Sequence, residues 1–141
     1  MLERLAVLLV VVATQGCTPA EPLPPVTPPA ATGALAGVRI AIRCVGPGGA
    51  EQPQRCEPFI KAFAAAGVVV VGKGEPHALD VSVDQPLGEW GAAGHCYVTT
   101  AKAAAQVASR DVPSNCDQPN VAEHAVAGWL ADPAIAAAAA P

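Results

Sequence analysis

The pattern of apolar and polar positions divides the chain into an apolar start, a proline-rich stretch and a folded region. The apolar run at residues 5–13, LAVLLVVVA, is too short to span a bilayer, which needs about 20 residues. Residues 18–37 contain six prolines, which exclude a helix and favour extended polyproline II geometry. From residue 38 onward, strand-like and helix-like spacings of apolar residues alternate, which predicts one domain over residues 38–135.

The first part of this domain predicts a strand, a helix and a second strand. Residues 38–45 alternate apolar with polar side chains, as a strand does. A helix is predicted to begin at Pro58, which suits the first helical position, and Phe59 and Phe63 would share its buried face. The uninterrupted apolar run at residues 68–71 predicts a central strand covered on both faces.

The second part predicts a sheet with one solvated face. Leu79, Val81 and Val83 alternate with polar residues, so one side of their strand meets water. The remaining predicted elements are strands at residues 96–102 and 107–112, a helix at 121–131 capped by Asn120, and an alanine-rich tail at 136–141. The order β-α-β-β-β-(β)-α predicts an α+β fold: a two-layer α/β sandwich with a mixed sheet of four to five strands and two helices on one face.

Composition and charge narrow the classes of function. Charged residues make up 14% of the chain and the net charge is −4, with the basic residues scattered. Such a surface cannot track a phosphate backbone, so no nucleic-acid partner is expected. Only five residues are aromatic (Phe 2, Trp 2, Tyr 1), so the core of so small a domain is marginal and cross-links are expected to support it.

A short motif follows the apolar run directly, at Thr14-Gln15-Gly16-Cys17. A short polar start, an apolar core and a small residue at its end are typical of an export signal. Gly16 and Cys17 resemble the end of the lipobox of bacterial lipoproteins, although Thr14 replaces the usual Leu and Gln15 is larger than the common residue. The resemblance implies that residues 1–16 are a signal peptide and that Cys17 is acylated on sulfur.

Lipidation would place the domain in the cell envelope. Ordinary cleavage after Ala20 is the alternative, which Pro19 disfavours. By the same resemblance, Thr18 rather than Asp after the cysteine implies anchoring in the outer membrane, with the domain on its periplasmic face. Residues 17–37 then form the lipidated cysteine and a tether of up to roughly 60 Å, at ~3.1 Å per residue. The tether is either a plain spacer or a reach toward the cell wall.

The cysteine count agrees with this interpretation. Five cysteines is an odd number, and assigning Cys17 to lipid leaves an even set. No C-x-x-C spacing occurs, so zinc and thioredoxin-type sites are disfavoured and two disulfides are expected. Of the three possible connectivities, we predict Cys44–Cys56 and Cys96–Cys116, because each pair is brought together by neighbouring elements.

The predicted order of elements resembles the α/β module of the TolB amino-terminal domain and of penicillin-binding-protein activator lipoproteins. In the latter, a lipid, a proline-rich tether and a small domain follow one another in the same order. The resemblance covers the architecture of residues 38–135 and no specific motif. It therefore implies a layout and assigns no residue a role.

Candidate chemistry is sparse. The histidines His77, His95 and His124 invite a metal or acid–base site, but no metal or haem motif surrounds them. His77 is not expected to share a face with Asp80. No serine lies in a G-x-S-x-G elbow, so the sequence assigns no catalytic residue, metal or cofactor. The side chains of Asp80, Ser82 and Asp84 are expected on a hydrated sheet face.

One loop carries an aromatic residue with two possible roles. Residues 85–94, QPLGEWGAAG, contain three glycines and Trp90. Trp90 either folds back over an end of the sheet or, together with Leu87, forms a partner-binding tip.

The leading hypothesis is a non-catalytic, lipid-anchored envelope protein that binds another protein or peptidoglycan. The alternatives are a small envelope hydrolase and a ligand- or metal-binding lipoprotein. An open, polar sheet would favour the first hypothesis. A cleft that holds His77 or His95 within hydrogen-bond reach of a Ser or Asp would favour the hydrolase. The sequence leaves the partner and the oligomeric state open.

The lipobox generates a direct prediction. Cys17→Ser removes the only sulfur to which the lipid could be attached, so metabolic labelling with a fatty acid should disappear and the protein should leave the membrane fraction. Persistent labelling of the Cys17→Ser chain would contradict lipidation at this position.

Overall fold

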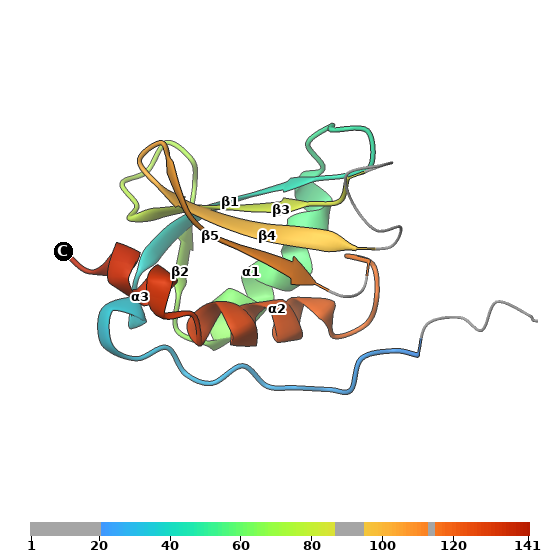
Figure 1. Cartoon of the computed structure of the whole chain (residues 1–141), viewed down its shortest axis with the longest axis horizontal. Helices are drawn as coiled ribbons and strands as arrows, with labels where there is room; N and C mark the ends of the chain where they lie inside the picture. The colour runs from blue at the N-terminus through green and yellow to red at the C-terminus, as the bar shows by residue number, and fades with distance from the viewer. Residues whose placement is uncertain (1–20, 87–94, 113–114) are drawn as a thin grey trace, which may run out of the picture.

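The structure is a computed structural model, and it describes residues 21–86, 95–112 and 115–141. It has two layers: a five-stranded sheet, and helices that cover only one of its faces (Figure 1). The strands are β1 (Arg39–Val45), β2 (Val69–Val71), β3 (Leu79–Asp84), β4 (Cys96–Lys102) and β5 (Ala105–Val112). The helices are α1 (Glu57–Ala65), α2 (Val121–Leu130) and α3 (Pro133–Ala139), with short 3-10 helices η1 (Gly33–Leu35) and η2 (Pro53–Cys56). The predicted α+β class and mixed sheet are confirmed.

The sheet has the strand order β2-β1-β3-β4-β5. β1 is parallel to both of its neighbours, β2 and β3, whereas β4 runs antiparallel to both β3 and β5. The prediction of a central strand at residues 68–71 is wrong, because β2 is an edge strand and Val69 is 41% exposed. A run of so few valines does not reveal how many of its faces are covered.

The core lies between the sheet and the helices. Phe59 and Phe63 from α1 and Trp129 from α2 are fully buried against the inward side chains of the sheet, as the helical spacing predicts. The indole of Trp129 meets the ring of Phe63 edge-on, with centroids 5.0 Å apart, and its N–H donates to Thr100 Oγ1 at 2.7 Å. The two helices and β4 are thereby joined at one point.

The carboxyl terminus forms a third helix, α3, where the sequence indicated an alanine-rich tail. Asp132 accepts a hydrogen bond from the backbone N–H of Ala134 (2.9 Å), and Pro133 occupies the first turn. Ile135 is only 1% exposed and anchors the helix to the core. The alanine-rich tail is thus helical and docked, because one apolar contact and an N-cap suffice to hold a segment of high helix propensity.

Residues 21–31, which we call the strap, lie along the helical layer (Figure 1). The backbone oxygens of Leu23 and Pro24 accept hydrogen bonds from Asn120 Nδ2 (2.9 Å) and His124 Nε2 (2.7 Å) of the α2 region. The sequence predicts that Asn120 caps α2. Asn120 does occupy the N-cap position, but its side chain makes no capping hydrogen bond. These residues of the predicted tether dock on the domain, since proline-rich backbone keeps its carbonyl acceptors although it lacks N–H donors.

The β4–β5 hairpin closes through a two-residue turn, Ala103-Ala104, because Lys102 pairs with Ala105. The φ angle of Ala103 is +57°, in the left-handed region that favours glycine. A Cβ in this conformation costs roughly 1 kcal/mol or more. The turn is therefore a point of backbone strain.

We expect Ala103→Gly to raise the free energy of unfolding by about 0.5 kcal/mol, since relief of the left-handed penalty outweighs the added freedom of the unfolded chain. Ala104→Gly is the matched control: its φ is not positive, so only the entropic cost applies and stability should fall. Urea denaturation of both variants measures the difference. A loss of stability in both would contradict the strained turn.

Candidate functional site

The uncovered face of the sheet is polar and has no helix above it in the part of the chain that the structure describes. Strand register sets four side chains in one row across the sheet, since Arg43 pairs with Ser82, Ser82 with Thr99, and Thr99 with Ser109. The next row along the strands holds Val45, Asp84, Tyr97 and Asp111. The predicted hydrated face is therefore present, and it extends across β1, β3, β4 and β5.

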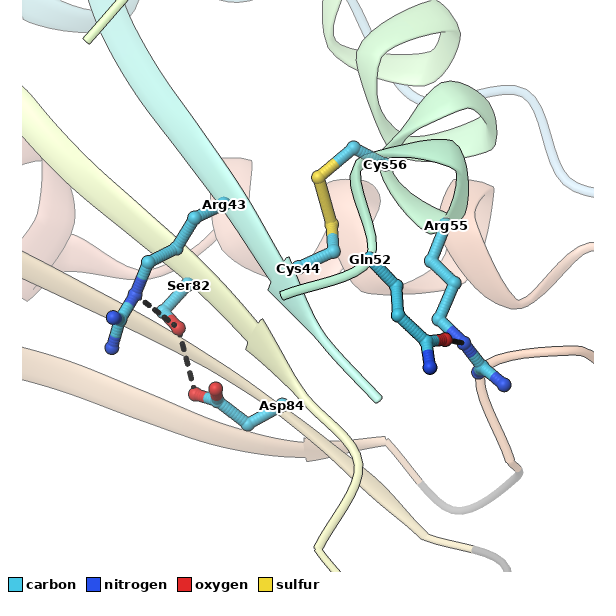
Figure 2. Close-up of a disulfide and its surroundings, with 7 residues drawn as sticks. All are labelled: Arg43, Cys44, Gln52, Arg55, Cys56, Ser82 and Asp84. Carbon is cyan, nitrogen blue, oxygen red and sulfur yellow. Dashed lines mark hydrogen bonds between the residues drawn. A yellow bond between two sulfur atoms is a disulfide. The ribbon is translucent and has the colours of Figure 1, made fainter. Parts of the chain in front are cut away.

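Hydrogen bonds fix the centre of this face. Arg43 Nε donates to Ser82 Oγ (3.2 Å), and Ser82 Oγ donates in turn to Asp84 Oδ2 (2.8 Å), as Figure 2 shows. Because the Ser82 proton is committed to a carboxylate and its oxygen to a guanidinium, this hydroxyl is held as a polar contact point.

A shallow depression of about 380 Å³ lies on the same face. Aliphatic side chains line it together with cationic, anionic and hydroxyl groups. It is lined by Ala41, Ile42, Arg43, Lys73, Asp80, Val81, Ser82, Thr99, Ala101 and Ala103. The strained turn residue Ala103 is thus one of the lining residues. A ligand here would meet donors and acceptors at fixed positions.

His77 contacts Asp80, contrary to the expectation that they share no face. Its Nε2 lies 2.9 Å from Asp80 Oδ1 and its Nδ1 lies 2.7 Å from the backbone oxygen of Glu75. Both partners are acceptors, so they favour the imidazolium, which donates from both ring nitrogens, over the neutral ring. The backbone bond to Glu75 and the bond to Asp80 accordingly raise the pKa of His77 from its ordinary value.

His95 forms the second histidine–carboxylate contact, with Nδ1 2.8 Å from Asp111 Oδ1. It lies at the end of the uncovered face and does not line the depression. No hydroxyl of the described residues completes a triad with it: Ser82 bonds Arg43 and Asp84, and Ser109 Oγ lies 3.5 Å from Thr99 Oγ1.

One of the two predicted disulfides is present. Cys44 and Cys56 are bonded, with Cα atoms 5.5 Å apart, and both are buried beside Gln52 and Arg55 (Figure 2). Cys96 and Cys116 are not bonded, but each thiol shifts the pKa of the other, so the two lie close together. Their disulfide stays a prediction.

Three of the predicted site residues, Cys17, Leu87 and Trp90, lie outside the described residues. Within residues 21–86, 95–112 and 115–141, no helix is long and apolar enough to cross a membrane, and no cluster of three metal-ligating side chains occurs. Sequence reasoning placed Asp80, Ser82 and Asp84 on the site but missed Arg43. The alternation of residues 38–45 was the available signal, because it directs Arg43 and the polar side of β3 to the same face.

The histidine contact predicts a pH dependence. Asp80→Asn should lower the pKa of His77, because the amide cannot match a carboxylate as acceptor for the imidazolium. A raised folded-state pKa stabilises the protein below about pH 6.5, and this contribution is lost as the pH rises through the folded value. The wild type should therefore exceed Asp80→Asn in stability at low pH, and the difference should shrink above that value.

NMR titration of the histidine ring protons measures the shift directly. Asp111→Asn is the matched control, since it removes a carboxylate beside His95 and should leave His77 unchanged. Equal shifts at His77 in both variants would contradict a local contact.

Comparison with known proteins does not assign the chain to a family. No protein-family model, no curated protein and no solved structure matches the chain. The architectural resemblance to TolB amino-terminal and activator-lipoprotein modules therefore remains an expectation, and function must be argued from the site itself.

Proposed function

We propose that this chain is an exported, non-catalytic lipoprotein, acylated on Cys17, whose domain binds the saccharide chains of peptidoglycan through the uncovered sheet face. Its proposed location is the periplasmic face of the outer membrane. The export signal and the lipobox support the location. The polar face supports the binding role.

The observation that carries the proposal is the row of hydrogen-bonded side chains across the sheet. Arg43 supplies donors, Asp84 supplies acceptors and Ser82 is held between them. A polyol needs both kinds of group at fixed spacing, and side chains already held by each other lose little entropy on binding. A protein partner would instead favour apolar anchors, whereas on the described part of this face Val69 is the one large apolar side chain that is well exposed.

The non-catalytic role rests on the state of the candidate groups. Ser82 has its proton engaged by Asp84, and the two acceptors beside His77 favour its protonated form. Neither group is arranged to activate the other. The hydrolase alternative retains only the His95–Asp111 contact, which lacks a hydroxyl partner in the described residues.

A second candidate, binding of an envelope protein, is favoured by the sequence of residues 85–94. Trp90 and Leu87 would supply the apolar anchors that the sheet face lacks. The same experiment separates the two candidates.

Purified peptidoglycan sacculi, incubated with the chain from residue 17 carrying Cys17→Ser, should sediment the wild-type domain. Arg43→Ala should weaken this binding about tenfold, the value expected for loss of a charged hydrogen-bond donor. Lys61→Ala is the matched control: it removes one positive charge from α1 on the covered side, where Lys61 is 74% exposed. It should bind as the wild type does.

Equal losses in Arg43→Ala and Lys61→Ala would indicate charge attraction alone and would contradict a specific face. No sedimentation with sacculi, together with cross-linking of envelope proteins that Trp90→Ala abolishes, would establish the protein-binding alternative.

A further inference from the structure

Two cysteine pairs differ sharply in their surroundings. The Cys44–Cys56 disulfide is almost fully buried, between the end of β1 and η2. Cys96, at the start of β4, is also completely buried, whereas its neighbour Cys116 is only half-buried. The second pair therefore has one sulfur inside the core and one near solvent.

Cys116 opens onto a cavity of about 600 Å³ between η2 and the start of α2. The cavity is polar at this end, where Arg55, Asp117 and Gln52 line it together with the thiol. It is large enough for a small peptide-like disulfide to approach Cys116. Cys96 does not line it, so external molecules reach the pair through one sulfur only.

Arg55 is fixed beside this cavity by three acceptors. Its Nη1 donates to Gln85 Oε1 (2.6 Å) and to Asp117 Oδ1 (3.1 Å), and its Nε donates to Gln52 Oε1. Gln52 itself packs on Gly46, where a Cβ would clash with its amide. The position of the guanidinium thus follows from the chain around the neighbouring disulfide (Figure 2).

The surroundings favour the thiolate at Cys116 and the thiol at Cys96. The hydrogen bond from Cys96 and the charge of Arg55 lower the pKa of Cys116, against burial and the carboxylates of Asp117 and Asp84. The same hydrogen bond and burial raise the pKa of Cys96, with smaller contributions from Asp111 and Asp117. A thiolate near solvent and a protonated buried partner are the arrangement of an attacking and a resolving thiol.

We propose that Cys96 and Cys116 form a reversible thiol–disulfide exchange site, in which Cys116 attacks the disulfide of a small thiol or peptide that enters the cavity. The Cys116 thiolate forms a mixed disulfide with one sulfur, and the other sulfur leaves as a thiolate that takes a proton from water. Cys96 then loses its proton to water and attacks the Cys116 sulfur, which releases the second thiolate. The external disulfide gains two electrons and becomes two thiols, while the protein pair is oxidised to the Cys96–Cys116 disulfide.

The exchange also defines the role of Arg55, which is a positioning residue beside the attacking sulfur. The predicted Cys96–Cys116 bond becomes the oxidised form of the site. The buried Cys44–Cys56 bond stays outside the cycle and serves as an internal control within the same molecule.

Glutathione disulfide is the probe. The protein is the chain from residue 17 carrying Cys17→Ser, after selective reduction of the Cys96–Cys116 pair. The wild type should release two glutathione thiols per chain and form the Cys96–Cys116 bond. Cys96→Ser should stop at a single adduct on Cys116, identified by peptide mapping. Cys116→Ser should react at least about 100-fold more slowly, because Cys96 is buried.

Excess reduced glutathione should then reopen the wild-type pair while Cys44–Cys56 remains closed. If the Cys96–Cys116 bond resists this treatment as Cys44–Cys56 does, the pair is a permanent structural disulfide and the proposal is wrong. The proposal also fails if the first adduct lies on Cys96. Acid quenching of the wild type at short times locates that first adduct even if a variant does not fold.

Arg55→Gln tests whether the guanidinium acts on the Cys116 thiolate, because a purely structural role of Arg55 would not change the pH profile of Cys116 alkylation. The pH profile of Cys116 alkylation should shift to higher pH, and the reaction at neutral pH should slow roughly threefold, because the smaller thiolate fraction is partly offset by higher nucleophilicity. Lys102→Gln is the matched control, since Lys102 lies at the opposite end of β4 from Cys96, and it should leave the profile unchanged. An unshifted profile in Arg55→Gln would show that the guanidinium does not act on Cys116.

Discussion

The hydrogen bond between Trp129 and Thr100 is the contact on which the arrangement of the two layers depends. A buried indole N–H without a partner is costly, and Thr100 is the buried polar side chain that β4 offers on its inward face. The bond fixes how far α2 sits along the sheet. Phe63 then packs edge-on against Trp129, so the position of α1 follows as well. In a core with so few aromatic residues, one misplaced ring would leave both helices without a defined register.

Several other contacts depend on the position of α2. Gly128 leaves room for the guanidinium of Arg110, whose Nε would lie 2.7 Å from a Cβ at that position. Asn120 and His124 present their donors to the strap only because the helix is held at this height. On the other side of the molecule, no helix of the described residues covers the sheet, because α1, α2 and α3 all pack against one side of it (Figure 1).

The sequence was most informative where a pattern is local. The alternation in β1 and β3 and the spacing of Phe59 and Phe63 predicted the sheet face and the buried side of α1 correctly, because period and burial coincide there. The Cys44–Cys56 pair was also predicted correctly, since its sequence separation is only 12 residues.

The exposure of β2 could not be predicted from three valines, and the contact of His77 with Asp80 depends on how the chain enters β3. The candidate site was predicted in part: Asp80, Ser82 and Asp84 share a face by alternation, whereas Arg43 joins them through a register between distant strands. The docking of the strap could not be predicted, because backbone carbonyl acceptors on a proline-rich segment produce no periodic pattern in the sequence.

The docked strap also changes how the domain would be presented to its surroundings. Between Cys17 and Glu21 stand only three residues, so a lipid at Cys17 would leave a span of about 14 Å at full extension while the strap stays in place. The strap runs on the helical side, so the uncovered sheet face lies on the opposite side of the molecule (Figure 1). A domain held by so short a linker would move mainly within the plane of its bilayer and meet partners by lateral diffusion. Contact with a more distant surface would require release of the bonds from Asn120 and His124, and the free energy of that release would be subtracted from the affinity measured for the distant partner.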